Sequence, residues 1–177
     1  MNLGQAILAA ATRAVDKINT CRVGILTQVD LPRLRCNVLL KGLLQGQRVE
    51  LFEVPIAVQA YHGSALIVAP KVGDIVLVAF TKQDLEQQLL NRDVVPVNER
   101  HQFSINNAVV IAGLYTLADT PPAVGEDEVL LHHVSGTEYR IRQTGDIEIT
   151  HHSGAGITIS GDGAVTITAK SVDFREL

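Results

Sequence analysis

Between Gly136 and Phe174 the chain repeats a short phrase in which a glycine is followed by two apolar residues that flank a polar one. Successive apolar pairs begin about 7–10 residues apart, a spacing typical of short strands joined by tight turns. The segment therefore predicts a repetitive β structure, with glycines in its turns because they lack a Cβ. The apolar pairs are Tyr139/Ile141, Ile147/Ile149, Ile157/Ile159, Val165/Ile167 and Val172/Phe174, and the glycines are Gly136, Gly145, Gly154, Gly156, Gly161 and Gly163.

Side chains alternate between the two faces of a strand, so each apolar pair shares one face and the residue between them points away. The residues expected on the outer face are all polar: Arg140, Glu148, Thr158, Thr166 and Asp173. A ribbon with one apolar face is marginally stable in water at best, so this face needs a cover.

Two arrangements could supply that cover. A single-chain solenoid commonly uses about 20 or more residues per rung, which is more than twice the spacing of these strands. Three identical chains around a common axis would bury their apolar stripes together, so we expect a homotrimer. Its core would contain Ile141, Ile147, Ile149, Ile157, Ile159, Val165 and Ile167. The alternative is a β-sandwich extension of the preceding domain, and the repeat alone leaves it open.

The first 120 residues have a different pattern. Apolar residues at helical spacing predict a short amphipathic helix over residues 3–18. Strand-like segments with turn signals between them follow, and five or six short strands in about 60 residues favour a small closed barrel or sandwich. These segments are CRVGILTQV, RLRCNVLL, QRVELFEV, PIAVQA, SALIVA and DIVLVAF, with a last strand expected over 108–112.

The phrase PKVGDIVLVAF contains a turn and then a continuous apolar run, 75–80, which predicts a strand buried on both faces. Residues 81–84 have the spacing of a capping box before a short helix. The segment ADTPPAVGEDE, with its prolines and acids, is typical of a linker. We therefore predict a domain over 1–120 and a second one over 121–177.

Charge and cysteine content limit the classes of function. The net charge is −4, with 15 Lys and Arg scattered among 19 Asp and Glu, so no nucleic-acid partner is expected. The N-terminal stretch is interrupted by charges too early for a membrane span and lacks the pattern of a signal peptide. Cys21 and Cys36 fall in phase with apolar neighbours and are expected to be buried free thiols, with a disulfide between them as the alternative.

No catalytic constellation is found, and no enzyme activity is predicted. Ser64 lacks the glycine setting of a hydrolase nucleophile, and His62 beside it is expected in a loop. Glu126, Asp127 and Glu128 could mimic paired carboxylates, but a run of acids in a linker is usually a solvated surface. A metal-dependent enzyme on a β-helix is the weakest alternative.

A helix and small barrel followed by a glycine-punctuated β shaft resembles the central spike of contractile phage tails, of the membrane-puncturing type without a lysozyme domain. The phrases PKVGDIVLVAF and RHQFSINNAVVIAGLY are similar to that family's N-terminal domain, and the I-x-I repeats are similar to its shaft. The resemblance implies an all-β fold: an OB-type barrel that forms a collar, then an intertwined trimeric β-helix or β-prism with backbone hydrogen bonds between chains.

The function implied by this resemblance is mechanical: contraction of the tail drives the spike through the host outer membrane. The implied partners are two further copies of the chain, the baseplate hub, the host outer membrane and, at the apex, a possible separate tip protein. The implied location is the virion, in the baseplate of the tail, after synthesis in the host cytoplasm. Another class remains open, a trimeric carbohydrate-binding tail fibre or baseplate adhesin module, although the few aromatic residues argue against it.

Spikes of this family often end in a His-x-His phrase whose three copies hold an iron ion on the threefold axis. This chain departs from that pattern, since its histidine pairs are adjacent, His132-His133 and His151-His152, and none follows residue 152. His151 shares the phase of Ile147 and Ile149, so three copies could hold an axial metal or anion; the alternative is an ordinary packed or turn histidine. No other cofactor is expected. The tip would then consist of Val172, Phe174, Arg175 and Glu176.

Overall fold

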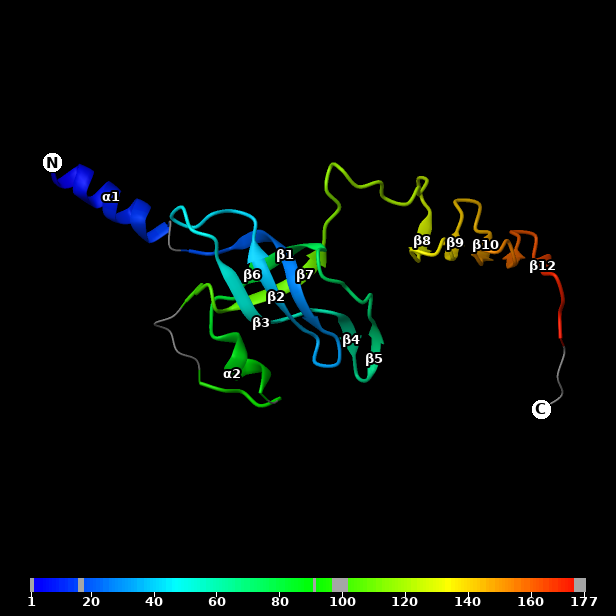
Figure 1. Cartoon of the computed structure of the whole chain (residues 1–177), viewed down its shortest axis with the longest axis horizontal. Helices are drawn as coiled ribbons and strands as arrows, with labels where there is room; N and C mark the ends of the chain where they lie inside the picture. Colours follow the sequence, from blue (N-terminus) through cyan, green and yellow to red (C-terminus); the bar gives the residue numbers. More distant parts are fainter. Residues whose placement is uncertain (1, 16–17, 91, 97–101, 174–177) are drawn as a thin grey trace. The chain divides into compact units, whose positions relative to one another are not determined.

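The computed structural model describes residues 2–15, 18–90, 92–96 and 102–173, and it is mostly β (Figure 1). The chain divides into two compact units, Met1–Asp119 and Thr120–Leu177. Each unit has its own five-stranded sheet.

Helix α1 (Leu3–Val15) begins the first unit. The Asn2 side chain caps it by accepting a hydrogen bond from the Gln5 N–H at 2.9 Å. Its apolar side chains Leu3, Ile7 and Leu8 are largely exposed. The sequence predicted a helix over 3–18; the structure ends it at Val15, and residues 16–17 lie outside the described part of the chain.

Five strands of the first unit form one antiparallel sheet in the order β3-β2-β1-β6-β7. The sheet curls into a half-barrel and brings its two edges together, where the Ala57 N–H donates to the Val110 carbonyl at 2.8 Å. A separate hairpin is formed by β4 and β5. The strands are β1 (Cys21–Asp30), β2 (Arg35–Leu40), β3 (Glu50–Pro55), β4 (Gln59–Tyr61), β5 (Ser64–Leu66), β6 (Ile75–Phe80) and β7 (Ala108–Gly113).

The concave side of this sheet holds the core, which consists of Leu26, Cys36, Val38, Leu40, Leu51, Val54, Val76, Val78, Phe80, Ala108 and Val110. Close packing requires a glycine at position 24, because a Cβ there would lie 2.2 Å from a methyl carbon of Val38. The prediction that β6 is buried on both faces is wrong. Its residues alternate between buried and half-buried because only one face of the sheet meets the core.

The two cysteines lie on opposite sides of the sheet. Cys36 is buried as predicted, and burial raises the pKa of its thiol to about 11. Cys21 is exposed, which corrects the prediction that both are buried. The reason is the phase of β1, in which Gly24 and Leu26 face the core and Cys21 lies on the other side.

Helix α2 (Leu85–Leu89) follows β6. Its N-cap is Asp84, whose carboxylate accepts from the Glu86 N–H at 3.0 Å. The capping box expected from Thr81 is therefore not formed, and the Thr81 hydroxyl donates instead to the Gln83 carbonyl at 2.7 Å.

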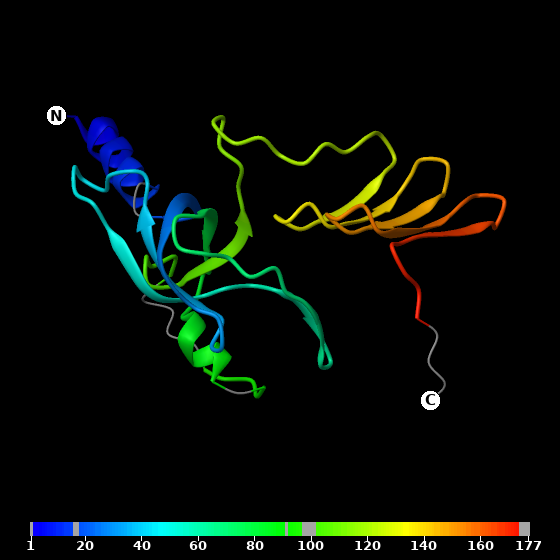
Figure 2. The ribbon, with the colours of Figure 1, turned by 45° about the vertical axis from the view of Figure 1, so that its right-hand side comes forward.

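The second unit is a meander, in which each strand pairs antiparallel with the next along the chain (Figure 2). The hydrogen bonds of this ladder therefore join strands of the same chain, whereas the resemblance implied bonds between chains. The strands are β8 (Val129–His132), β9 (Glu138–Ile141), β10 (Ile147–Thr150), β11 (Gly156–Ile159) and β12 (Val165–Thr168).

Candidate functional site

Four hairpin turns of the second unit share one geometry and recur every nine residues. Gly136, Gly145, Gly154 and Gly163 have φ angles of 85–87°, in the left-handed region that favours glycine. In the turn around Gly145, for example, the Gly145 N–H donates to the Arg142 carbonyl at 2.8 Å and the Arg142 N–H to the Asp146 carbonyl at 2.9 Å. Asp127, nine residues before Gly136, also has a positive φ of 58°, so the period starts before β8.

Two further glycines were predicted in turns. Gly161 lies in the turn before β12, as predicted. Gly156 does not lie in a turn: it is the first residue of β11, opposite Thr150 and Thr168. A Cβ at position 156 would lie 2.6 Å from the Ile149 carbonyl oxygen, so the close approach of β10 requires glycine there.

One face of the meander carries two columns of apolar side chains. Within each column, the side chains lie opposite one another on neighbouring strands. The register pairs Ile147 with both Ile141 and Ile159, and Ile149 with both Tyr139 and Ile157. All seven residues predicted for the trimer core lie in these columns. The columns are Val129–Ile141–Ile147–Ile159–Val165 and Leu131–Tyr139–Ile149–Ile157–Ile167.

This apolar face is exposed within a single chain. Ile149 is 46% exposed, Val165 61% and Ile167 54%, and no described residue of the second unit is fully buried. Val129 and Leu131 extend the columns to β8, and sequence reasoning missed them. The signal was hidden because Leu130 between them is also apolar, which disguises the alternation.

The opposite face is polar, as predicted for four of its residues: Arg140, Glu148, Thr158 and Thr166 lie opposite one another on successive strands. The fifth, Asp173, lies beyond the end of β12.

A network of charged side chains crosses the first three strands of this polar face. Arg140 binds Glu128 at 2.7 Å and Glu138 at 3.0 Å, and Arg142 binds Glu128 at 3.2 Å and Glu148 at 2.9 Å. The Glu128 and Arg140 side chains are only 10% and 12% exposed. The network also holds the segment before β8, because Arg140 donates to the Ala123 carbonyl at 3.1 Å.

The electrostatics of this network favour the ionised forms of Glu128 and Glu138. The pKa of Glu128 is lowered to about 2 by a hydrogen bond from the Gly125 N–H and by both arginines, against the opposing effect of burial. The pKa of Glu138 is lowered by His132 and then by Arg140. Glu128 was predicted to be a solvated linker acid, and that prediction is wrong. The register of β8 and β9 places Glu128 opposite Arg142, and this pairing would have predicted the ion pair.

The histidine pairs lie in or beside two hairpin turns. His132 binds Glu138 through Nδ1 at 2.9 Å, and the rings of His151 and His152 have centroids 3.9 Å apart. His133 and His151 have equivalent settings, because the Nδ1 atom of each accepts from the N–H of the serine two residues later. In the neutral ring the proton is then on Nε2.

The predicted axial ion at His151 stays a prediction. The described residues include no group of three or more His, Cys, Asp or Glu side chains placed to hold a metal within one chain. A metal bound at Nε2 of His151 would also require the ring proton to leave that atom. Of the predicted tip, Val172 is half exposed, whereas Phe174, Arg175 and Glu176 lie outside the described residues.

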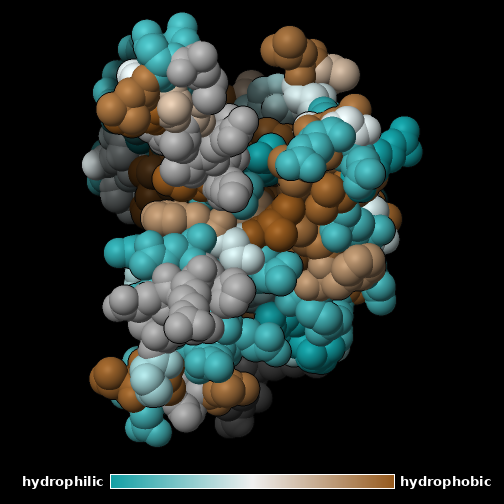
Figure 3. Space-filling model, turned by 90° about the vertical axis from the view of Figure 1, so that its left-hand side faces the viewer, coloured by the Kyte–Doolittle hydropathy of each residue, from teal (hydrophilic) through white to brown (hydrophobic). Residues whose placement is uncertain are grey.

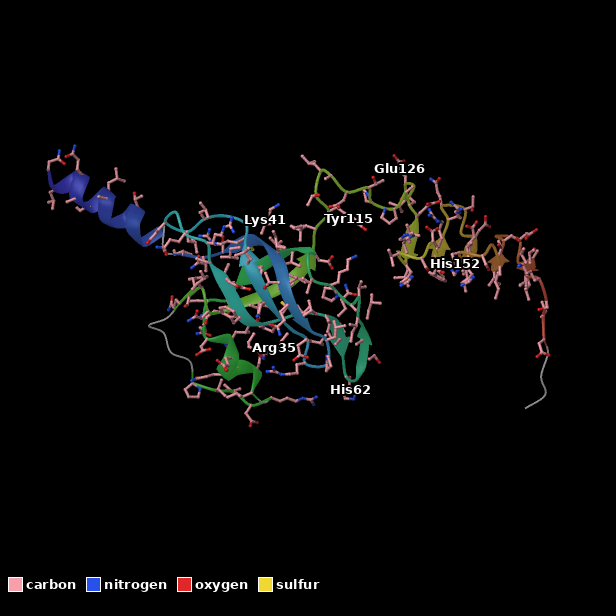
Figure 4. The ribbon with its side chains drawn as sticks, viewed as in Figure 1. Arg35, Lys41, His62, Tyr115, Glu126 and His152 are labelled. Carbon is pink, nitrogen blue, oxygen red and sulfur yellow. The ribbon has the colours of Figure 1, made fainter. Side chains whose placement is uncertain are left out.

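The first unit contains an apolar groove of about 780 Å³ between the segment around Val58, the hairpin base at Leu66 and the end of β7. Figure 3 shows that apolar side chains also reach the surface among polar ones. His62 lies in the β4–β5 turn, away from the groove, and Ser64 begins β5 (Figure 4). Neither residue is among those that line the groove.

Neither described helix is both long and apolar enough to span a bilayer. Comparisons with protein-family models and with curated proteins found no match to this sequence.

Proposed function

We propose that the chain is a trimeric central spike of a contractile phage tail, or of a phage-derived injection particle, that punctures the host outer membrane mechanically. The observation that carries this proposal is the exposed pair of apolar columns on a sheet one layer thick. Burial of apolar surface contributes about 25 cal/mol per Å², so ten such side chains favour association strongly.

Three copies of the meander can bury these apolar faces in a closed trimer. Their apolar faces pack around a common axis as the three sides of a β-prism, and their polar faces point outward. Because the ladder hydrogen bonds join strands of one chain, each side of the prism is one chain's sheet, and the chains are held together by side-chain packing. Such a shaft is narrow and stiff, as a membrane-piercing element needs to be.

In this proposal the half-barrel unit is an OB-type collar that joins the shaft to the baseplate hub. The charged network on the polar face fits a shaft, because it ties the segment around Ala123 to the first strands without using the apolar face. No catalytic step is assigned to the chain, and its site of action is the tail of the virion.

A truncation of the chain in intact particles tests this function. Particles whose spike ends after Asp119 are expected to assemble and to contract, but to lose outer-membrane breach, measured as entry of an otherwise excluded dye into the host. A matched control carries Thr166→Ser on the polar face and keeps full breach. Truncated particles that breach the membrane as well as complete ones would contradict the proposal. Loss of cell attachment with glycan-array binding by the full chain would identify an adhesin instead.

A further inference from the structure

The two turn-bearing edges of the second sheet carry opposite chemistry, and we propose that they bind each other between neighbouring copies of the chain. Turns 133–137 and 151–155 lie on one edge, where a Cβ on Gly136 would be 3.8 Å from that of His152. Turns 142–146 and 160–164 lie on the other, where Asp146 accepts from the Gly161 N–H at 2.6 Å. This alternation follows from the meander, in which successive turns change sides.

One edge is rich in imidazoles and the other in carboxylates. The first, called the histidine edge, carries His132, His133, His151 and His152. Its two turns contain no acid, and Glu138 beside the first turn is already bound by His132 and Arg140. The second, called the acidic edge, carries Glu126, Asp127, Asp146 and Asp162. Figure 4 shows Glu126 and His152 at opposite edges. The nearby Arg142 does not neutralise the acidic edge, because its guanidinium binds Glu128 and Glu148 on the polar face.

The side chains on both edges are oriented for such a contact. Because Nδ1 of His133 and of His151 accepts a backbone N–H, the Nε2–H of each neutral ring can donate to a carboxylate. On the acidic edge, Asp162 is held by the Ser160 hydroxyl and the Ala164 N–H, and both lower its pKa. A carboxylate oxygen has two lone pairs, so these acids can accept further hydrogen bonds.

The identity of the partner follows from symmetry, and this step rests on the proposed trimer. Around a threefold axis parallel to the stacking direction of the strands, the turns lie at the corners of the prism. Rotation places the histidine edge of one chain against the acidic edge of the next, a heterologous contact that closes after three copies. Contacts between two like edges would instead need a twofold axis and would give dimers.

The positions of the turns along the threefold axis are also compatible with this pairing of edges. Turns on one edge recur at every second strand, about 9.6 Å apart, because neighbouring strands are about 4.8 Å apart. Turns on the other edge fall halfway between them. The turn around His152 of one chain would therefore lie between the turns around Thr144 and Asp162 of its neighbour.

Cross-linking tests the pairing of edges. The full chain with Cys21→Ser, Ser153→Cys and Thr144→Cys is treated with a short bis-maleimide; Cys36 is buried and contributes little. We expect a covalent trimer on a reducing denaturing gel, whereas variants with only one of the two new cysteines stay as single chains. Cross-linked dimers from either single variant would overturn the proposal. So would a double variant that keeps the trimer mass but does not cross-link. A wild-type chain that is monomeric without cross-linker would instead overturn the trimer itself.

A charge swap provides an independent test. His133→Asp with His151→Asp places acids against acids, and Asp suits the first position of these turns. At low salt this variant is expected to need roughly tenfold more protein to assemble. Adding Asp146→Lys and Asp162→Lys places lysines opposite the new acids and should recover part of the assembly, because Glu126 and Asp127 remain acidic. Equal assembly of the wild type and the acidic variant would contradict the edge pairing.

Discussion

The two units of this chain use the same alternation of apolar and polar residues and reach different outcomes. In the first unit the sheet curls until β3 meets β7, so that eleven apolar residues are buried by the chain itself. In the second unit each strand has only four residues and pairs only with its neighbours, and the apolar columns stay exposed. Curling buries the apolar face of the first sheet within one chain, whereas the apolar face of the second sheet stays exposed and would be buried only in the proposed trimer.

The largest effect is expected on the apolar face of the second unit. Ile149→Glu introduces three carboxylates into the interior of the proposed prism, where no partner can neutralise them. The full chain should lose its trimer completely, measured by light scattering after gel filtration. The control Thr166→Glu lies on the polar face opposite Thr158 and should leave the trimer mass unchanged. If Ile149→Glu assembled like the wild type, the apolar face of the second unit would not be the trimer interface, and the proposed difference between the two units would be contradicted.

The core of the first unit provides the converse test. Leu26 is 1% exposed, so Leu26→Ala should lower the free energy of unfolding of this unit by about 3 kcal/mol, through lost burial and a cavity. Denaturant unfolding measures this loss. The trimer mass should persist, because the proposed interface is in the other unit. Dissociation of the trimer by this variant would show that the first unit carries the contacts.

A smaller effect is expected from the turns of the second unit. Gly154→Ala forces a side chain into the left-handed region, at φ 85°, which costs about 1–2 kcal/mol per chain. Thermal unfolding of the second unit should shift downward accordingly. Gly42→Ala in the first unit is the matched control, because its Cβ would meet no atom within 4 Å. Equal shifts for both variants would contradict the assigned role of the nine-residue turns.

The smallest effect is expected from the pH dependence of the charged network. The pKa of Glu128 falls from 4.5 to about 2 on folding, so its contribution to stability is present above pH 4.5. It is lost as the pH falls toward 2. Glu128→Gln lacks this titration, so the stability difference from the wild type should shrink between pH 4.5 and 2 in thermal unfolding. A difference that stays constant across this range would contradict the network.

Much of the fold could be predicted from alternation alone, because strands such as β10 and β11 show their two faces through their own residues. The uniformly apolar run of β6 has no such alternation, and its burial on one face alone could not be predicted. The contacts that could not be predicted depend on the register in which the strands pair. The partnership of Glu128 with Arg140 and Arg142 becomes visible only when β8, β9 and β10 are aligned. Likewise, Cys21 is exposed because β1 turns Gly24, a residue without a side chain, toward the core. Apolar residues reveal a face, but they do not say whether the same chain covers it.

The mass of the full chain in solution tests the central claim most directly. Native mass spectrometry at micromolar concentration is expected to give about 57 kDa, three times the 19.1 kDa chain. A mass of 19.1 kDa under the same conditions would contradict it, because the apolar columns of the second unit would then be stable without a partner.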